Sequence, residues 1–247
     1  MALDEALMRR ARATGEWTLR VYAWSVPTLS LGRNQLARGG YDLDALRDGG
    51  VDIVRRPTGG RAILHHHEVT YSVTGPVDAA GDLGESYGRI NRLLLAGLRK
   101  LGAPVTIASR LEPAVHGHRE TGQPGLLPCF HHPSPGEITL EGRKLAGSAQ
   151  WRREGAFLQH GSILVDDDQM HIASFLTHPG PRIPEPATLR QALGRSPDIT
   201  EVADALFSAV RSVEDRYAPL LDLDDALASS ADALRERYLD RCWTWRR

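Results

Sequence analysis

One stretch of the chain carries most of the information about the fold, and it reads Arg55-Arg56-Pro57-Thr58-Gly59-Gly60-Arg61-Ala62-Ile63-Leu64-His65. Its proline and paired glycines are typical of a tight loop, and the flanking apolar residues predict strands over 51–54 and 61–64. Paired glycines also expose backbone amides, which can surround an acyl chain or a phosphate group. Most such turns only reverse the chain, so this loop alone assigns no function.

Outward from this loop, strands dominate the first two thirds of the chain and helices dominate the last third. Alternating apolar residues predict strands, and apolar residues three or four apart predict helices. The expected strands cover 19–24, 28–31, 69–74, 137–140, 144–149 and 157–165. The expected helices cover 2–13, 42–47, 85–101, 199–217 and 223–241. Strands with interleaved helices indicate an α+β (mixed α/β) fold, with a largely antiparallel β-sheet core flanked by helices.

Composition excludes several classes of protein. The chain has 247 residues, of which 41% are hydrophobic and 25% are charged, as in ordinary globular proteins. A formal net charge of −1 argues against a protein that binds nucleic acid by neutralising phosphates. No apolar run approaches the roughly 18 residues of a membrane span. Two cysteines are too few for a disulfide framework, which predicts a cytoplasmic protein.

Cys129 is the first candidate for a reactive group. It follows a polar stretch over 109–128 that is rich in glycine and proline and predicts a long surface loop. Most free cysteines are small buried hydrophobic residues, and that interpretation stays open here. A cysteine is nucleophilic only as a thiolate, so it needs a nearby cation to lower its pKa. The candidates within reach in the sequence are His131, His132 and Lys144.

Lys144 is the second candidate, because the only other lysine among 30 basic residues is Lys100. It lies in a predicted hairpin, where a solvated Arg–Lys pair is the ordinary interpretation. Small residues follow it, and their backbone amides can approach a carbonyl or phosphate oxygen closely. These small residues are Gly147, Ser148 and Ala149.

The ten histidines do not predict a metal site. Those at 65–67 are consecutive, and consecutive side chains on a strand point to opposite faces. None of the histidines has the spacing of a zinc finger or of two ligands on one helix. The position of His160 in the sequence is equally consistent with a side chain packed in the core and with one that lines a pocket. Near the end of the chain, Cys242 is expected to be structural, and Trp243 and Trp245 are expected to anchor the tail.

Three segments, taken together, resemble the biotin/lipoate protein ligase family. They are the loop 55–65 with the following Glu68-Val69-Thr70-Tyr71-Ser72-Val73, the segment 142–150 around Lys144, and Leu158-Gln159-His160-Gly161-Ser162-Ile163-Leu164. The resemblance runs over residues 2–176 and more loosely over 238–247. It implies a biotin/lipoate ligase-like catalytic domain over 1–176. Residues 177–247 are then expected to form a helical extension packed on the same domain, with no separate accessory domain.

Two chemistries occur in that family, and the resemblance favours one of them. Its ligases use ATP and magnesium to form lipoyl-AMP and then acylate a lysine of a lipoyl domain. Its cysteine-dependent octanoyltransferases take an octanoyl group from acyl carrier protein and pass it to the target lysine. Cys129 lies 15 positions before Lys144, which resembles these transferases, whereas the ligases usually lack that cysteine. A lipoyl-domain binding protein without catalytic activity is the last alternative.

The resemblance also implies substrates and site residues. The expected reaction moves an octanoyl group from octanoyl-acyl carrier protein, where phosphopantetheine carries it, to the lysine of apo lipoyl domains or glycine-cleavage H protein. Cys129 is expected to form the acyl thioester, and Lys144 is expected to lower its pKa. The residues expected to bind the acyl group or substrate are Arg56, Thr58, Gly59, Gly60, Arg61, His65, Gly147, Ser148, Ala149, His160 and Gly161. No bound cofactor, metal, nucleic acid or membrane is expected, and a monomer suffices.

Overall fold

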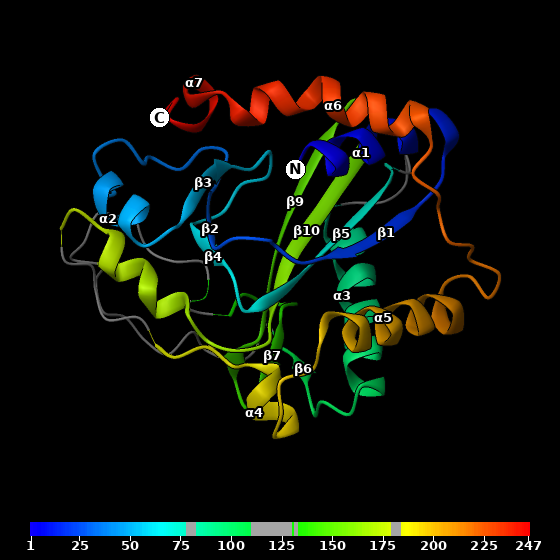
Figure 1. The fold of residues 1–247 in the computed structure, drawn as a ribbon. Helices are drawn as coiled ribbons and strands as arrows, with labels where there is room; N and C mark the ends of the chain where they lie inside the picture. Colours follow the sequence, from blue (N-terminus) through cyan, green and yellow to red (C-terminus); the bar gives the residue numbers. More distant parts are fainter. Residues whose placement is uncertain (78–82, 110–129, 131–132, 179–183) are drawn as a thin grey trace.

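The computed structural model describes residues 1–77, 83–109, 130, 133–178 and 184–247 (Figure 1). Nearly all of the polar stretch 109–128 lies outside these residues, so its assignment as a surface loop stays a prediction. The described residues also do not include the candidate nucleophile Cys129 or its neighbours His131 and His132. No helix within the described ranges is long and apolar enough to cross a bilayer.

Helices and strands are interleaved through the first two thirds of the chain, and the elements of the last third are helices. The helices are α1 (Ala2–Thr14), α2 (Leu43–Asp48), α3 (Leu83–Lys100), the 3-10 helix η1 (Gln169–Phe175), α4 (Leu189–Leu193), α5 (Ile199–Val213), α6 (Asp225–Leu239) and α7 (Arg241–Thr244). The strands are β1 (Thr18–Tyr22), β2 (Thr28–Leu31), β3 (Asp52–Arg55), β4 (Ile63–His65), β5 (Glu68–Pro76), β6 (Thr106–Ile107), β7 (Ile138–Leu140), β8 (Arg143–Lys144), β9 (Ala146–Arg153) and β10 (Ala156–Leu164).

The strands form three sheets. The largest has the order β1-β5-β10-β9, and all of its pairings are antiparallel. The second has the order β3-β2-β4, with β2 parallel to β3 and antiparallel to β4. The third is the small antiparallel sheet β6-β7-β8. Among the named strands only β2 and β3 run parallel, so the predicted mixed α/β fold with a largely antiparallel core is confirmed.

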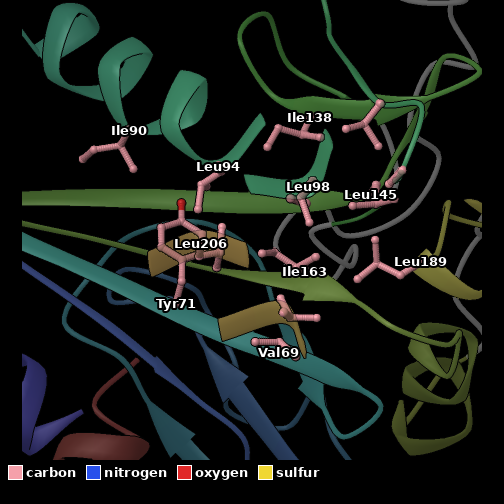
Figure 2. Close-up of a cluster of buried hydrophobic side chains, with 14 of the residues drawn as sticks. Val69, Tyr71, Ile90, Leu94, Leu98, Ile138, Leu145, Ile163, Leu189 and Leu206 are labelled. Carbon is pink, nitrogen blue, oxygen red and sulfur yellow. The ribbon is translucent and has the colours of Figure 1, made fainter. Parts of the chain in front are cut away.

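The main hydrophobic core lies between the four-stranded sheet and helices α3 and α5 (Figure 1). Helix α3 turns Ile90, Leu94 and Leu98 inward at intervals of four residues, as its sequence predicts. Figure 2 shows these side chains gathered with Tyr71 of β5 and Leu206 of α5. Fully burying such a side chain stabilises the fold by about 1.5–3 kcal/mol, so this cluster holds the sheet in place.

The opposite face of the same sheet carries α1. Because side chains alternate along a strand, Leu158 of β10 points away from the α3 side and contacts Met8 of α1. Helix α6 then packs on α1, where Leu227 and Leu234 contact Leu7 (Figure 1). Residues beyond 176 therefore contribute to burying the first helix of the chain.

The last residues of the chain return to the second sheet. The buried Arg55 guanidinium donates to the Thr244 carbonyl at 2.7 Å, and the Trp243 indole donates to the Arg55 carbonyl at 2.8 Å. Trp245 packs against the core of this sheet, so the predicted anchoring of the tail is confirmed. Cys242 is exposed, and its expected structural role is wrong, because Trp243 and Trp245 make the contacts that anchor the tail.

Two predicted boundaries also need correction. The strand expected over 144–149 changes sheets at Leu145, whose amide donates to the Ile138 carbonyl and whose carbonyl accepts from Leu164. It therefore appears as β8 in one sheet and β9 in another. The helix expected over 199–217 ends at Val213, and the helix expected over 223–241 covers Asp225–Leu239, where Asp224 caps its first turn.

Candidate active site

One face of β10 meets the second sheet and the loop before β4. Residues 160, 162 and 164 share this face because they alternate along the strand. Each contacts one partner across the junction: Thr58 bonds to His160, His65 bonds to Ser162, and Ile63 packs against Leu164. Successive contacts are about 7 Å apart along β10. The structure thus brings together Thr58, His65 and His160, three of the residues predicted for the site.

Thr58 and His160 belong to a buried polar network. Thr58 Oγ1 lies 2.6 Å from His160 Nε2, and His160 Nδ1 faces Asp4 Oδ2 at 4.0 Å. Burial lowers the pKa of His160, so the imidazole is neutral at pH 7. A carboxylate can only accept, so it favours the tautomer with the proton on Nδ1, and the Thr58 hydroxyl then donates to Nε2.

Asp4 is a member of this network that the sequence interpretation missed. It is fully buried and accepts from Arg20 at 2.7 Å and from Ser72 at 2.8 Å. Burial alone would raise the pKa of Asp4, but the N-terminal ammonium, His160 and Arg20 together hold it well below its ordinary value. The sequence contains a signal for the burial of Asp4, because it lies four residues before the buried Met8 and therefore on the same face of α1.

His65 forms a second buried group. Its Nδ1 donates to Glu68 Oε1 at 3.2 Å and lies 3.2 Å from Ser162 Oγ, while its ring stacks on Trp24 with centroids 4.4 Å apart. Two atoms of this group, His65 Nε2 and Glu68 Oε2, are buried without a hydrogen-bond partner among the described residues. Buried polar atoms rarely stay unpaired, so these two are positions where a bound molecule would complete the bonding.

The predicted loop is held by an arginine. The Arg56 guanidinium donates to the carbonyls of Ser30 at 2.8 Å, Gly59 at 2.9 Å and Arg61 at 2.6 Å. Gly60 has a φ of 92°, a conformation that favours glycine. Arg56 also donates to the Ser30 hydroxyl at 2.9 Å. This residue, expected to bind substrate, therefore also shapes the loop that carries Thr58.

Lys144 lies in a separate buried cluster at the hairpin between β7 and β8. Its Nζ is 2.8 Å from Glu137 Oε1, and both side chains are at most 5% exposed. The same ammonium lies 5.4 Å from the centre of the Phe130 ring, and Glu137 also accepts from the Ser134 amide at 2.7 Å. Lys144 is therefore a buried, paired cation, and the ordinary interpretation of a solvated Arg–Lys pair does not apply to it.

Glu137 was not predicted as a functional residue, although the register of the predicted hairpin places it close to Lys144. Glu141 and Gly142 both have positive φ, as a two-residue hairpin turn requires, and this turn pairs Thr139 with Lys144. Glu137 stands two residues before Thr139. It is therefore the diagonal neighbour of Lys144 on the same face of the hairpin, within reach of a long side chain.

The segment 147–149 lies on β9, and its side chains divide between two faces. Gly147 and Ala149 pair with Ser162 and His160 and share their face, whereas Ser148 faces the core and accepts from the Tyr71 hydroxyl at 2.7 Å. Because β9 is an edge strand of its sheet, alternate amides point away from β10. Those outward amides are free of the β10 ladder and can bind an oxyanion.

Gly161, also predicted for the site, has a packing role. A β-carbon there would collide with the Gly147 carbonyl oxygen and lie 2.9 Å from a ring carbon of Tyr71. We expect Gly161→Ala to lower the free energy of unfolding by about 1–3 kcal/mol, measured by urea denaturation. Gly59→Ala is the matched control, because a β-carbon at Gly59 meets no atom within 4 Å. Equal stability of the two variants would contradict this packing.

Comparison with known proteins places the chain in a family. The model of the lipoyl protein ligase A/B catalytic domain matches residues 1–211. An octanoyltransferase LipM of Kyrpidia tusciae is 38% identical, over 100% of this chain and 94% of the relative. An octanoyltransferase LipM of Moorella thermoacetica is 48% identical, over 67% of this chain and 60% of the relative.

Solved structures show the same fold. A crystal structure of lipoate-protein ligase A bound with ATP superposes with a TM-score of 0.75 over 99% of this chain and 92% of that chain, at 23% identity. Protein Ta0514 of T. acidophilum, solved with bound lipoic acid, has a TM-score of 0.75 with the same coverage and identity. The family model, the relatives and the fold agree: this chain belongs to the lipoyl protein ligase A/B catalytic domain family.

Proposed function

We propose that this protein transfers an octanoyl group from octanoyl-acyl carrier protein to the lysine of apo lipoyl domains or glycine-cleavage H protein, through an acyl thioester on Cys129. Full-length similarity to proteins named octanoyltransferase supports the reaction class. One structural observation supports the assignment of residues. Phe130, which is bonded directly to Cys129, packs beside the buried ammonium of Lys144.

The first step forms the acyl-enzyme. The Cys129 thiolate attacks the carbonyl carbon of the octanoyl thioester, a new carbon–sulfur bond forms, and the phosphopantetheine thiolate leaves. Lys144 lowers the pKa of Cys129, because a cation in a partly desolvated site stabilises the thiolate. Outward amides of β9 near Gly147 and Ala149 stabilise the developing oxyanion, a role worth roughly 3 kcal/mol for each donor.

The second step releases the product. The neutral amine of the acceptor lysine attacks the thioester on Cys129 and an amide bond forms as the carbon–sulfur bond breaks. The Cys129 thiolate leaves, and the proton lost by the amine passes to solvent. The octanoyl chain lies beside the Gly59–Gly60 loop during both steps. The apolar contact of Ile63 with Leu164 and Phe130 supports this placement, because Phe130 follows Cys129 in the sequence and forms part of this hydrophobic surface.

This reaction needs no resident cofactor, since the thioester supplies the activated acyl group. The ligase alternative needs ATP and magnesium to activate a free acid, and the ligase structures support that alternative only at the level of fold. The cytoplasmic location and the monomeric state stay predictions.

A mass measurement tests the proposal. We expect incubation with octanoyl-acyl carrier protein, without ATP, to raise the intact mass of the protein by one octanoyl group. Hydroxylamine should remove that group, because it cleaves thioesters. The control is incubation with free octanoate, ATP and magnesium, which should produce neither acyl-AMP nor an adduct. An unchanged mass with the carrier protein, or an adduct that requires ATP, would overturn the proposed function.

A further inference from the structure

The bend between β4 and β5 carries two histidine side chains that the site above does not use. His66 and His67 are about half exposed, and their rings stack with centroids 3.8 Å apart. Both Nδ1 atoms approach the same oxygen, Oδ2 of Asp168, at 2.8 Å for His66 and 3.5 Å for His67. The three side chains thus direct a ligand-type atom to one point, all within 4.8 Å of one another.

This arrangement differs from the expectation that the consecutive histidines at 65–67 point to opposite faces. Neighbouring side chains point to opposite faces only where the residues lie on one strand, and the triple histidine does not. The strand β4 ends at His65, and the next two residues form the bend. The backbone of the bend is anchored, because the His67 carbonyl accepts from the amides of Val165 and Asp166 at 3.0 Å each. The two rings are therefore held beside the segment that carries Asp168.

Asp168 does not have the ordinary role of an aspartate at its position. It is the N-cap residue of η1, yet its side chain accepts no hydrogen bond from that helix. The carboxylate is only 9% exposed, and its Oδ1 is buried without a hydrogen-bond partner among the described residues. A buried carboxylate is costly unless its negative charge is paired, and a cation bound at its Oδ2 supplies that pairing.

We propose that His66, His67 and Asp168 bind one Zn²⁺ ion. Two imidazole nitrogens and one carboxylate oxygen are a common zinc ligand set, and an ion held by three protein ligands keeps further positions for water. Ligand atoms in a tetrahedral zinc site are roughly 3.3 Å apart, close to the separations of Asp168 Oδ2 from the two imidazoles. Mg²⁺ prefers oxygen ligands in an octahedral arrangement, so this donor set selects against it.

A bound ion would join two segments that are distant in the sequence. It would fasten the bend after His65 to the beginning of η1, which follows β10. This inference does not depend on the proposed acyl transfer, because none of its three ligands takes part in that reaction.

Isothermal titration of the full chain with Zn²⁺ tests the inference. We expect one site per chain in the wild type, with affinity reduced about 100-fold or more in His67→Ala and Asp168→Asn, since even outer-shell changes cost 10–100-fold. The matched control is His171→Ala, an exposed histidine outside the cluster, which should bind like the wild type. Saturating Zn²⁺ should raise the melting temperature by roughly 5 °C in the wild type and the control only.

The same experiment can overturn the site. Binding that survives in His67→Ala and Asp168→Asn would assign Zn²⁺ to other histidines of the chain. If the folded wild type binds no Zn²⁺, the proposal is wrong, and the three side chains only form hydrogen bonds within the bend. Crystals soaked in Zn²⁺ give an independent location, because an anomalous peak about 2.0–2.2 Å from the three ligand atoms is expected, and a peak elsewhere contradicts the proposal.

Discussion

Replacing Cys129 by alanine is expected to lower the rate of octanoyl transfer by at least about 10³-fold. Without the sulfur no acyl thioester can form, and a residual rate can come only from direct attack by the acceptor lysine on a bound substrate. The measurement is the octanoylation of an apo lipoyl domain, followed by intact mass. The same variant should also show no acyl adduct of its own after exposure to octanoyl-acyl carrier protein.

The chain contains its own matched control for this variant. Cys242 is the only other cysteine and is exposed, so Cys242→Ala should keep the full rate and still form the adduct. Cys129→Ser is also expected to be inactive, because a serine hydroxyl without a strong base is far less nucleophilic than a thiolate. Full activity of either Cys129 variant would show that the acyl group does not pass through this residue.

Replacing Lys144 by methionine is expected to affect both stability and rate. The Glu137 carboxylate would remain buried without its cation, which should lower the free energy of unfolding by about 3–5 kcal/mol. The rate of acyl-enzyme formation at pH 7 should fall by roughly 30-fold or more. A cysteine without a nearby cation is only a few per cent thiolate at that pH.

A double variant separates these two effects. In Lys144→Met/Glu137→Gln the buried charge is removed along with its partner, so much of the lost stability should return. The rate should stay low, because the cation that lowers the pKa of Cys129 is still missing. If the double variant recovers its rate together with its stability, Lys144 has only a structural role.

Alkylation of Cys129 gives a direct measurement of the thiolate. In a Cys242→Ala background, the rate of reaction with iodoacetamide should follow the ionisation of Cys129 as the pH rises. The midpoint should lie below the ordinary thiol value of about 8.5 and should move toward it in the double variant. An identical profile in both proteins would remove Lys144 from the activation of the thiol.

Local signals predicted much of the fold. Apolar spacing in 85–101 predicted α3, and the proline and glycines of 57–60 predicted the loop before β4, because these signals act over a few neighbouring residues. The combined motifs also indicated the family. The strand over 144–149 was predicted as one element, since no local signal shows that Leu145 is bonded to two sheets.

The site was predicted less completely, for a physical reason. Thr58, His65 and His160 were identified, but their partners Asp4 and Glu68 were not, because the pairing of these side chains depends on packing that buries them together. The burial of Lys144 against Glu137 likewise depends on the register of β7 with β8.

The sequence by itself determined most of the elements, the largely antiparallel fold, the family and the chemically capable side chains, because propensity and motif are properties of short segments. Only the tertiary structure decided which of those side chains share a buried space. It joined Asp4 of the first helix to His160 of β10, and it turned His66 and His67 toward Asp168. Electrostatic coupling depends on separation and on the exclusion of water, and both arise only when distant segments pack together.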